Sequence, residues 1–253
     1  MSDVLVEARD GILVVTLNRP ESKNAVNRDV AEGVAAAMDE LDGNPDLRVG
    51  VLTGAGGVFC AGMDLKAFVS GSTPMLPGRG FGGLTQSPPA KPLIAAAEGW
   101  VLAGGLEMAL ACDMIVASEA AKFGVPEVTR GLFPAAGGAL LLHKRIPRAV
   151  AMEMVLSGKP ITAQRAFEVG LVNRLVEPGS ALDSALELAA TIAANGPLAV
   201  TTSKGIIQRS ADWSVEQSWE EQKEYYDLVF NSEDAKEGAT AFAEKRAPQW
   251  KGR

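Results

Sequence analysis

Short apolar runs alternate with helical stripes along the first two thirds of the chain. β-branched residues dominate residues 4–8 and 12–17, and the Asp10-Gly11 pair between them is typical of a hairpin turn. An apolar stripe with helical spacing then follows Asn27, a good capping residue, and stops near Gly43-Asn44-Pro45. This part of the pattern predicts a hairpin followed by an amphipathic helix.

The same alternation recurs further along the chain. Strand pairs followed by helices, repeated several times, predict an α/β fold built of stacked strand-strand-helix turns. The further predicted strands cover residues 49–52, 93–97 and 114–117, and the further predicted helices cover residues 64–69, 104–111 and 134–142.

Residues 70–90 interrupt this pattern with many Gly, Pro, Ser and Thr residues, which favours a long loop or lid. Residues 78–83 match the G-x-G-x-x-G fingerprint of dinucleotide sites. That site requires a preceding strand and a following helix, and both are missing here, so a flexible loop is the better interpretation. Gly158-Lys159 precedes a proline and lacks the upstream glycine of a phosphate loop, which excludes that motif as well.

From residue 181 onward the pattern indicates helices only, over residues 181–194, 198–209, 215–229 and 232–244. This layer carries several aromatic residues, so we expect it to pack against a neighbouring subunit as well as the core. We divide the chain near Pro178-Gly179, into a core of residues 1–178 and a helical oligomerisation region of residues 179–253. The aromatic residues are Trp213, Trp219, Tyr225, Tyr226 and Phe230.

Composition and charge narrow the class of protein. The 253 residues are 47% hydrophobic and 22% charged, which suits a globular protein, and the net charge of −7 argues against a nucleic-acid partner. No apolar run is long enough to span a membrane, and the acidic first nine residues do not resemble a secretory signal. With only Cys60 and Cys112, the chain reads as a reduced, cytoplasmic protein, although a disulfide is possible in principle. His143 is the single histidine, so a multi-histidine metal site is excluded.

Two segments carry candidate chemistry. Residues 58–66 form a strand-to-helix turn of small residues, where free backbone N–H groups can hold a developing negative charge. Asp64 could equally serve there as a simple helix cap. In the second segment, Gly104-Gly105 opens an apolar helix and Glu107 falls in its first turn. A buried carboxylate with a shifted pKa is a candidate acid or base, although an exposed helix face is the alternative.

Glu127 follows Pro126 and lies twenty residues after Glu107. A single glutamate in such a place is commonly a surface residue. As a pair, the two carboxylates would suit general acid-base work on neighbouring atoms.

The segments FCAGMDLK, AAEGWVLAGGLEMALACD, FGVPE and GLFPAAGG, together with the opening LNRPESKNAV, closely resemble the crotonase (enoyl-CoA hydratase/isomerase) superfamily over nearly the whole chain. The resemblance implies a spiral core with C-terminal helices that build trimers, commonly paired into hexamers. It implies an acyl-CoA substrate, of which coenzyme A is a part, and no separate cofactor or metal.

The resemblance also implies the site residues. The thioester oxygen would lie between the N–H groups of Met63 and Gly104, and Glu107 and Glu127 would hold the water as base and acid, with labels that could exchange. The Gly and Pro content of the 70–90 loop, and its place directly after Met63, further predict that it is mobile without ligand and borders the acyl pocket together with Met63 and Trp100. The expected substrate-binding residues are Arg19, Ala25, Ala61, Asp64, Leu65, Lys66 and Trp100.

These residues imply a hydro-lyase that adds water to a 2-enoyl-CoA, a reaction of fatty-acid β-oxidation. Met63 is bulkier than the alanine typical of short-chain hydratases and Val125 replaces a polar residue, so the acyl group stays open. Ala103 stands where many members carry a third glycine. The alternatives are a reaction like that of carnitinyl-CoA dehydratases, double-bond isomerisation, thioester hydrolysis, and acyl-CoA binding without turnover.

Overall fold

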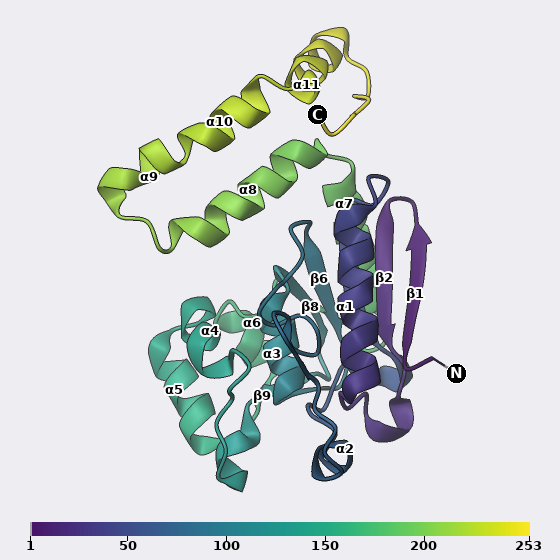
Figure 1. Cartoon of the computed structure of the whole chain (residues 1–253), viewed down its shortest axis with the longest axis vertical. Helices are drawn as coiled ribbons and strands as arrows, with labels where there is room; N and C mark the ends of the chain where they lie inside the picture. The colour runs from purple at the N-terminus through teal and green to yellow at the C-terminus, as the bar shows by residue number, and fades with distance from the viewer. Residues whose placement is uncertain (1) are drawn as a thin grey trace.

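A computed structural model describes residues 2–253; Met1 lies outside the described residues. The strands form a main sheet with the order β1-β2-β3-β6-β8-β11, in which β1 is antiparallel to β2 and the other neighbours are parallel (Figure 1). The predicted hairpin is confirmed, with Asp10 and Gly11 at positive φ in its turn. The strands are β1 (Val4–Arg9), β2 (Ile12–Leu17), β3 (Val49–Gly54), β6 (Leu93–Ala97), β8 (Met114–Ser118) and β11 (Arg174–Val176).

A second, smaller sheet is built from short strands, two of which directly follow a strand of the main sheet in sequence. β7 (Trp100–Leu102), β9 (Lys122–Gly124) and β10 (Ile161–Thr162) form a sheet with the order β10-β9-β7. Two isolated bridges, Cys60 with Val101 and Val26 with Met63, place the segments after β3 and β2 beside this sheet. Successive main-sheet strands are thus each followed by a short extended segment, as the predicted strand-strand-helix turns require.

Helices cover both faces of the main sheet. One apolar cluster includes residues of α1 and α3, and a smaller one packs α7 against the other face. The helices of this part are α1 (Arg28–Gly43), α2 (Leu65–Val69), α3 (Gly104–Ala111), α4 (Gly138–Arg145), α5 (Arg148–Ser157), α6 (Ala163–Glu168) and α7 (Ala181–Ala193), with the 3-10 turns η1 (Pro20–Ser22), η2 (Ala55–Gly57) and η3 (Pro126–Arg130).

α7 packs as part of the core, although the sequence places it in the C-terminal region. Ala185 and Ala189 are fully buried against the main sheet, and Glu98 Oε1 accepts hydrogen bonds from Gly179 N and Ala181 N at the start of the helix. By packing, the helical extension therefore begins after α7. The division at 178/179 stays a prediction of functional regions.

Two predicted elements differ from the structure. Residues 70–90 contain a small hairpin, β4 (Met75–Leu76) with β5 (Gly80–Phe81), and both Phe81 and Leu84 are buried in the core, so this segment is no free-standing lid. The helix predicted from residue 134 begins only at Gly138, because the backbone of Gly137 is non-helical, with a positive φ of 129°. The Ala136 and Gly138 N–H groups donate instead to the Glu107 side chain.

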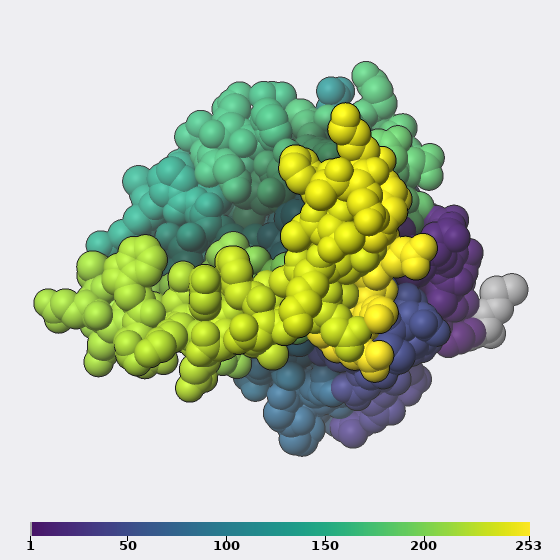
Figure 2. Space-filling view, turned by 90° about the horizontal axis from the view of Figure 1, so that it is seen from above, coloured from purple at the N-terminus to yellow at the C-terminus, as the bar shows by residue number. Residues whose placement is uncertain are grey.

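The remaining helices, α8 (Pro197–Ser210), α9 (Val215–Glu221), α10 (Lys223–Phe230) and α11 (Glu233–Glu244), form a C-terminal arm. The arm lies beside the core and projects past it at α9 (Figures 1 and 2). Lys204 anchors α8, since its Nζ donates to Pro89 O and Lys91 O and pairs with Asp113 at 2.7 Å. Among residues 2–253, no helix is both long and apolar enough to cross a membrane.

Candidate active site

The start of α3 is held unusually close to its surroundings. Ala103 takes a positive φ of 52°, and its N–H donates to Gly124 O, which ties the turn to β9. A Cβ on Gly105 would overlap Cys60 O, so only glycine fits there. The first N–H groups of a helix have no partner inside it, and at Gly104 this leaves a free donor.

The turn before α2 lies against this helix start. A Cβ built on Gly62, whose φ is +103°, would lie 2.7 Å from Ala103 Cβ and 3.3 Å from Gly104 N. The bridge between Val26 and Met63 uses Gly62 O and Asp64 N, so the Met63 N–H takes no part in it. The structure therefore brings the two predicted backbone donors, at Met63 and Gly104, into one small region.

Glu107 is a carboxylate inside the core. Its side chain lies in the first turn of α3, the residue is 3% exposed, and Oε1 accepts hydrogen bonds from Ala136 N at 2.7 Å and Gly138 N at 2.9 Å. Burial raises the pKa of Glu107 to about 7, the charge of Glu127 adds to this rise, and the two N–H donors oppose it. The exposed helix face considered from sequence is therefore wrong.

Glu127 faces the same region from η3. Burial raises the pKa of its carboxyl group, opposed by a backbone hydrogen bond and by the charge of Arg130. Among residues 2–253, its Oε2 is buried and has no hydrogen-bond partner. A buried, unpaired carboxylate oxygen is costly, and a water or substrate atom would satisfy it. The two glutamates are close enough for the charge of Glu127 to raise the pKa of Glu107.

Most of the predicted coenzyme A residues gather around one turn. Arg19 Nη1 pairs with Asp64 at 3.0 Å and donates to Ala25 O, while Ala61 N donates to Lys23 O. Burial raises the pKa of Asp64, but hydrogen bonds from Ala67 N, Arg19 and Lys66 N outweigh it and leave the pKa lowered.

Asp64 also caps α2, which begins at Leu65, so the helix-cap interpretation of this residue is confirmed. Trp100 is joined to the region through its carbonyl, which accepts from Cys60 N. Its ring lies 5.8 Å from the Lys122 ammonium, and its predicted place in the acyl pocket stays a prediction.

Asn24 supports this turn and was not singled out from the sequence. It is fully buried with φ +53°, its Nδ2 donates to Ala55 O and Val58 O, and its Oδ1 accepts from Arg19 N. The only available signal was its place in the opening motif. Buried asparagine at positive φ is a known device for closing tight turns, but neither burial nor φ can be read from one sequence.

Neither cysteine thiol is a candidate for the chemistry, although Cys60 helps to build the turn, where its Sγ accepts a hydrogen bond from Gly62 N. Cys60 and Cys112 are both free and buried, and burial raises the pKa of each thiol to about 12. His143 is exposed in the last turn of α4. Within residues 2–253, no group of three or more potential ligands among His, Cys, Asp and Glu could hold a metal ion.

Comparison with known proteins shows which protein family this chain resembles. The chain matches the model of the family "Enoyl-CoA hydratase/isomerase" over residues 7–253. It is 43% identical to enoyl-CoA hydratase EchA19 of Mycobacterium tuberculosis, covering 99% of this chain and 97% of that protein. It is 42% identical to the carnitinyl-CoA dehydratase of Proteus mirabilis, covering 97% of each.

Solved structures agree. A crystal structure of enoyl-CoA hydratase from Mycobacterium tuberculosis superposes with a TM-score of 0.99 at 56% identity over 100% of both chains. A carnitinyl-CoA hydratase from Mycobacterium avium superposes with a TM-score of 0.80 at 42% identity, again over 100% of both chains. The predicted fold is confirmed, and the chain belongs to the enoyl-CoA hydratase/isomerase family.

Proposed function

We propose that this protein is a 2-enoyl-CoA hydratase, a hydro-lyase that adds water across a conjugated thioester. The observation that carries the proposal is the pair of carboxylates, buried Glu107 and half-buried Glu127, set beside two backbone donors at Met63 and Gly104. Relatives and solved structures that bear the name enoyl-CoA hydratase support the same reaction.

The chemistry follows from where charge develops. When water attacks the β-carbon, electrons move through the conjugated system onto the thioester oxygen and form an enolate. Two N–H groups aimed at that oxygen stabilise it, and losing one such donor costs about 3 kcal/mol in comparable oxyanion holes. In this scheme Met63 and Gly104 supply the two donors.

The hydrogen bonds distinguish the two glutamates. Oε1 of Glu107 already accepts two N–H groups, which stabilises an ionised carboxylate and leaves Oε2 to take a proton from water. Oε2 of Glu127 accepts no hydrogen bond from residues 2–253, which suits a carboxyl group that carries a proton to the α-carbon. In this proposal Glu107 is the base and Glu127 the acid, and because they share one water the two roles can exchange.

Burial raises both pKa values, so the two carboxyl groups can share one proton. The hydroxyl group from the attacking water and the proton from Glu127 together add one water to the double bond. The proton that Glu107 gains then replaces the one that Glu127 gives.

Coenzyme A would lie along the Arg19–Asp64 turn. An exposed Leu65 and the adjacent Lys66 would contact it there, together with Ala25 and Ala61. Trp100 completes the substrate-binding residues in this proposal. Coenzyme A enters as part of the substrate, so the reaction requires no separate cofactor.

A trimer, or a hexamer of two trimers, is the assembly we propose. Large apolar side chains on the arm are exposed, including Trp219 at 77% and Phe230 at 62%. A mostly apolar groove of about 790 Å³ separates α8 from the core and includes Ile192, Val200 and Ile207. In Figure 2 the arm stands apart from the core over a hollow. Closed symmetric assembly would cover such surfaces.

With its two thiols buried and unpaired, we place the enzyme in the cytoplasm.

The alternative acyl group is that of carnitinyl-CoA, favoured by the 42% identity to a carnitinyl-CoA dehydratase. That reaction uses the same carboxylate pair. Isomerisation is less favoured, because one carboxylate suffices to move a proton along the chain. Acyl-CoA binding without turnover would leave Glu107 and Glu127 with no chemical task.

A substrate panel tests the proposal. Straight-chain 2-enoyl-CoA thioesters of increasing length and carnitinyl-CoA are offered separately, and the conjugated-thioester absorbance is followed. We expect loss of absorbance with at least one enoyl-CoA. Absorbance that grows only with carnitinyl-CoA would select the alternative, and binding without any change would remove the hydratase proposal.

A further inference from the structure

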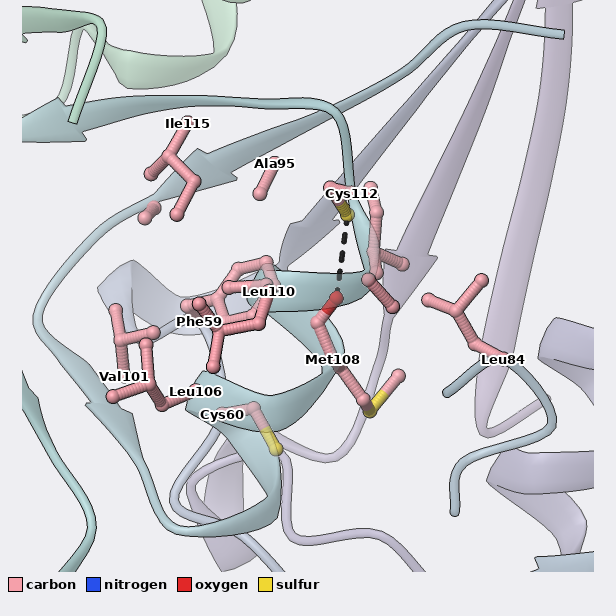
Figure 3. Close-up of a cluster of buried hydrophobic side chains, with 14 of the residues drawn as sticks. Phe59, Cys60, Leu84, Ala95, Val101, Leu106, Met108, Leu110, Cys112 and Ile115 are labelled. Carbon is pink, nitrogen blue, oxygen red and sulfur yellow. Dashed lines mark hydrogen bonds between the residues drawn. The ribbon is translucent and has the colours of Figure 1, made fainter. Parts of the chain in front are cut away.

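The glycine-rich segment of residues 78–83 packs tightly between two helices. A Cβ on Gly83 would overlap Ala31 O of α1, and a Cβ on Gly82 would lie 2.7 Å from Met108 Sδ of α3. Both glycines have positive φ. Figure 3 shows Leu84, directly after this segment, beside Met108. The glycines therefore permit close approach of this segment to α1 and α3, where a dinucleotide loop would bind phosphate instead.

Phe81 is held within this segment by its own backbone. Its N–H donates to Thr85 Oγ1 at 2.9 Å, and its carbonyl accepts from Leu84 N and Thr85 N, both at 3.3 Å. The side chain is 5% exposed, so the ring is fixed in the core. A local turn thus sets the direction of one aromatic ring.

The far edge of that ring meets the start of α3. A Cβ built on Gly104 would overlap the Cζ and Cε1 atoms of Phe81 and would lie 3.0 Å from Cε2. On another side, the Cβ position of Gly62 is 3.3 Å from Gly104 N. The Gly104 backbone is therefore bracketed by Phe81 and by the Met63 turn.

We propose that Phe81 is a positioning residue for the reaction: its ring edge fixes the Gly104 N–H in the direction that the enolate oxygen requires. This inference rests on the proposed function, in which Gly104 is an oxyanion donor. Glycine at a helix start has wide backbone freedom, and Ala103 before it has positive φ, so a packed neighbour is needed to define the donor. Oxyanion donors act over a narrow range of distances, and misplacement by about 1 Å can cost on the order of 10²-fold in rate.

The experiment compares Phe81→Leu and Phe81→Ala with Leu84→Ala as the matched control. Leu84 is fully buried in the same segment but packs beside Met108. One readout is kcat and KM for hydration of the best 2-enoyl-CoA. The second is the absorbance of bound cinnamoyl-CoA, which moves to longer wavelength when donors polarise its thioester carbonyl.

We expect kcat to fall about 10- to 100-fold in both Phe81 variants, with KM changed less than about threefold and the absorbance shift reduced. Leu84→Ala should keep both the shift and kcat within about threefold, even if it unfolds at lower temperature. If the Phe81 variants retain the shift and kcat, the ring only packs and the inference is wrong.

A second comparison uses the contact itself. Gly104→Ala should lose the absorbance shift, because its methyl group meets the Phe81 ring. Adding Phe81→Ala to this variant should restore part of the shift and raise kcat about tenfold over Gly104→Ala alone. Additive losses would overturn the role of Phe81. A wild-type protein that neither hydrates an enoyl-CoA nor shifts cinnamoyl-CoA would overturn the proposed function together with this inference. Wild-type hydration and shift, unchanged in the Phe81 variants, would overturn this inference alone.

Discussion

The start of α3 and the C-terminal arm depart from the usual distribution of residues in opposite ways. At α3 an ionisable side chain, Glu107, is buried in a helix whose residues are all buried and otherwise apolar. On the arm, Trp219 and Phe230 are among the most exposed large side chains. Burying a carboxylate and exposing aromatic rings both oppose folding of the single chain. In the first region we relate the cost to chemistry, and in the second to contact with another subunit.

The two regions also differ in what holds them. Glu107 is fixed by backbone N–H groups from a distant loop, so its position depends on the whole core. The arm is tied to the core at its first helix, through Lys204 and Asp113, and its outer helix α10 packs on α8 and on α9. Substitutions in the two regions should therefore affect different properties, which the following experiments measure.

The largest effect should come from the glutamates. We expect Glu107→Gln and Glu127→Gln each to lower the hydration rate by about 10²–10⁴-fold, because an amide keeps the shape of the side chain but does not exchange the proton. Acyl-CoA should still bind, which equilibrium dialysis can show. Rates close to wild type in either variant would take that residue out of the mechanism.

A pH series should reveal the cost of burying Glu107. Its pKa is raised from 4.5 to about 7 in the folded protein, so between these values the folded state holds more protons than the unfolded state. This group therefore favours folding below pH 4.5, and that contribution is lost as the pH rises to about 7. The loss is on the order of 3 kcal/mol at most.

The matched comparison is the urea-unfolding free energy of wild type and Glu107→Gln at several pH values. The variant should gain stability relative to wild type as the pH rises from about 4.5 to 7. A difference that does not change with pH would show that Glu107 keeps an ordinary pKa in the folded protein.

Asn24 tests the support beneath the oxyanion turn. Asn24→Ala removes three hydrogen bonds and leaves at positive φ a residue that tolerates this conformation less well than asparagine, so we expect a loss of about 2–3 kcal/mol in unfolding free energy. Asn24→Gly is the control, because glycine accepts positive φ, and it should be about 1 kcal/mol more stable than the alanine variant. Equal stability of the two would mean that backbone strain contributes nothing here.

The sequence predicted long, strongly patterned elements well and short ones poorly. The helix after Asn27 is confirmed, and its apolar stripe and its capping residue are both visible in the sequence. The helix with Glu107 is confirmed as well, although it has no capping side chain and is otherwise apolar all round; the Gly104-Gly105 pair marked its start. The strands β7, β9 and β10 were missed, because two or three residues are too few to show an alternating pattern. The helix predicted over residues 215–229 is divided into α9 and α10.

For the site, charged and glycine residues inside apolar runs gave visible signals, and Glu107 was found that way. The groups that hold these residues in place gave no such signal in the sequence. The Ala136 and Gly138 N–H groups act through the backbone, which every residue shares, and the contact of Phe81 with Gly104 joins segments that only the fold brings together.

Substitutions on the arm should have the smallest effect on the stability of the fold. They should have a separate effect on assembly. Trp219 is 77% exposed on α9, so Trp219→Ser should change the unfolding free energy of the single chain by no more than about 0.5 kcal/mol. If a neighbouring subunit covers this ring, the same change should weaken association by about 2–4 kcal/mol, roughly 30- to 1,000-fold in the dissociation constant. Sedimentation equilibrium over a range of concentrations measures that constant. Glu220→Ala, an exposed charge on the same helix, is the matched control and should leave the mass distribution unchanged. A wild-type mass near 26.4 kDa at micromolar concentration would contradict the proposed assembly, and the exposed aromatic side chains of the arm would then require a different partner.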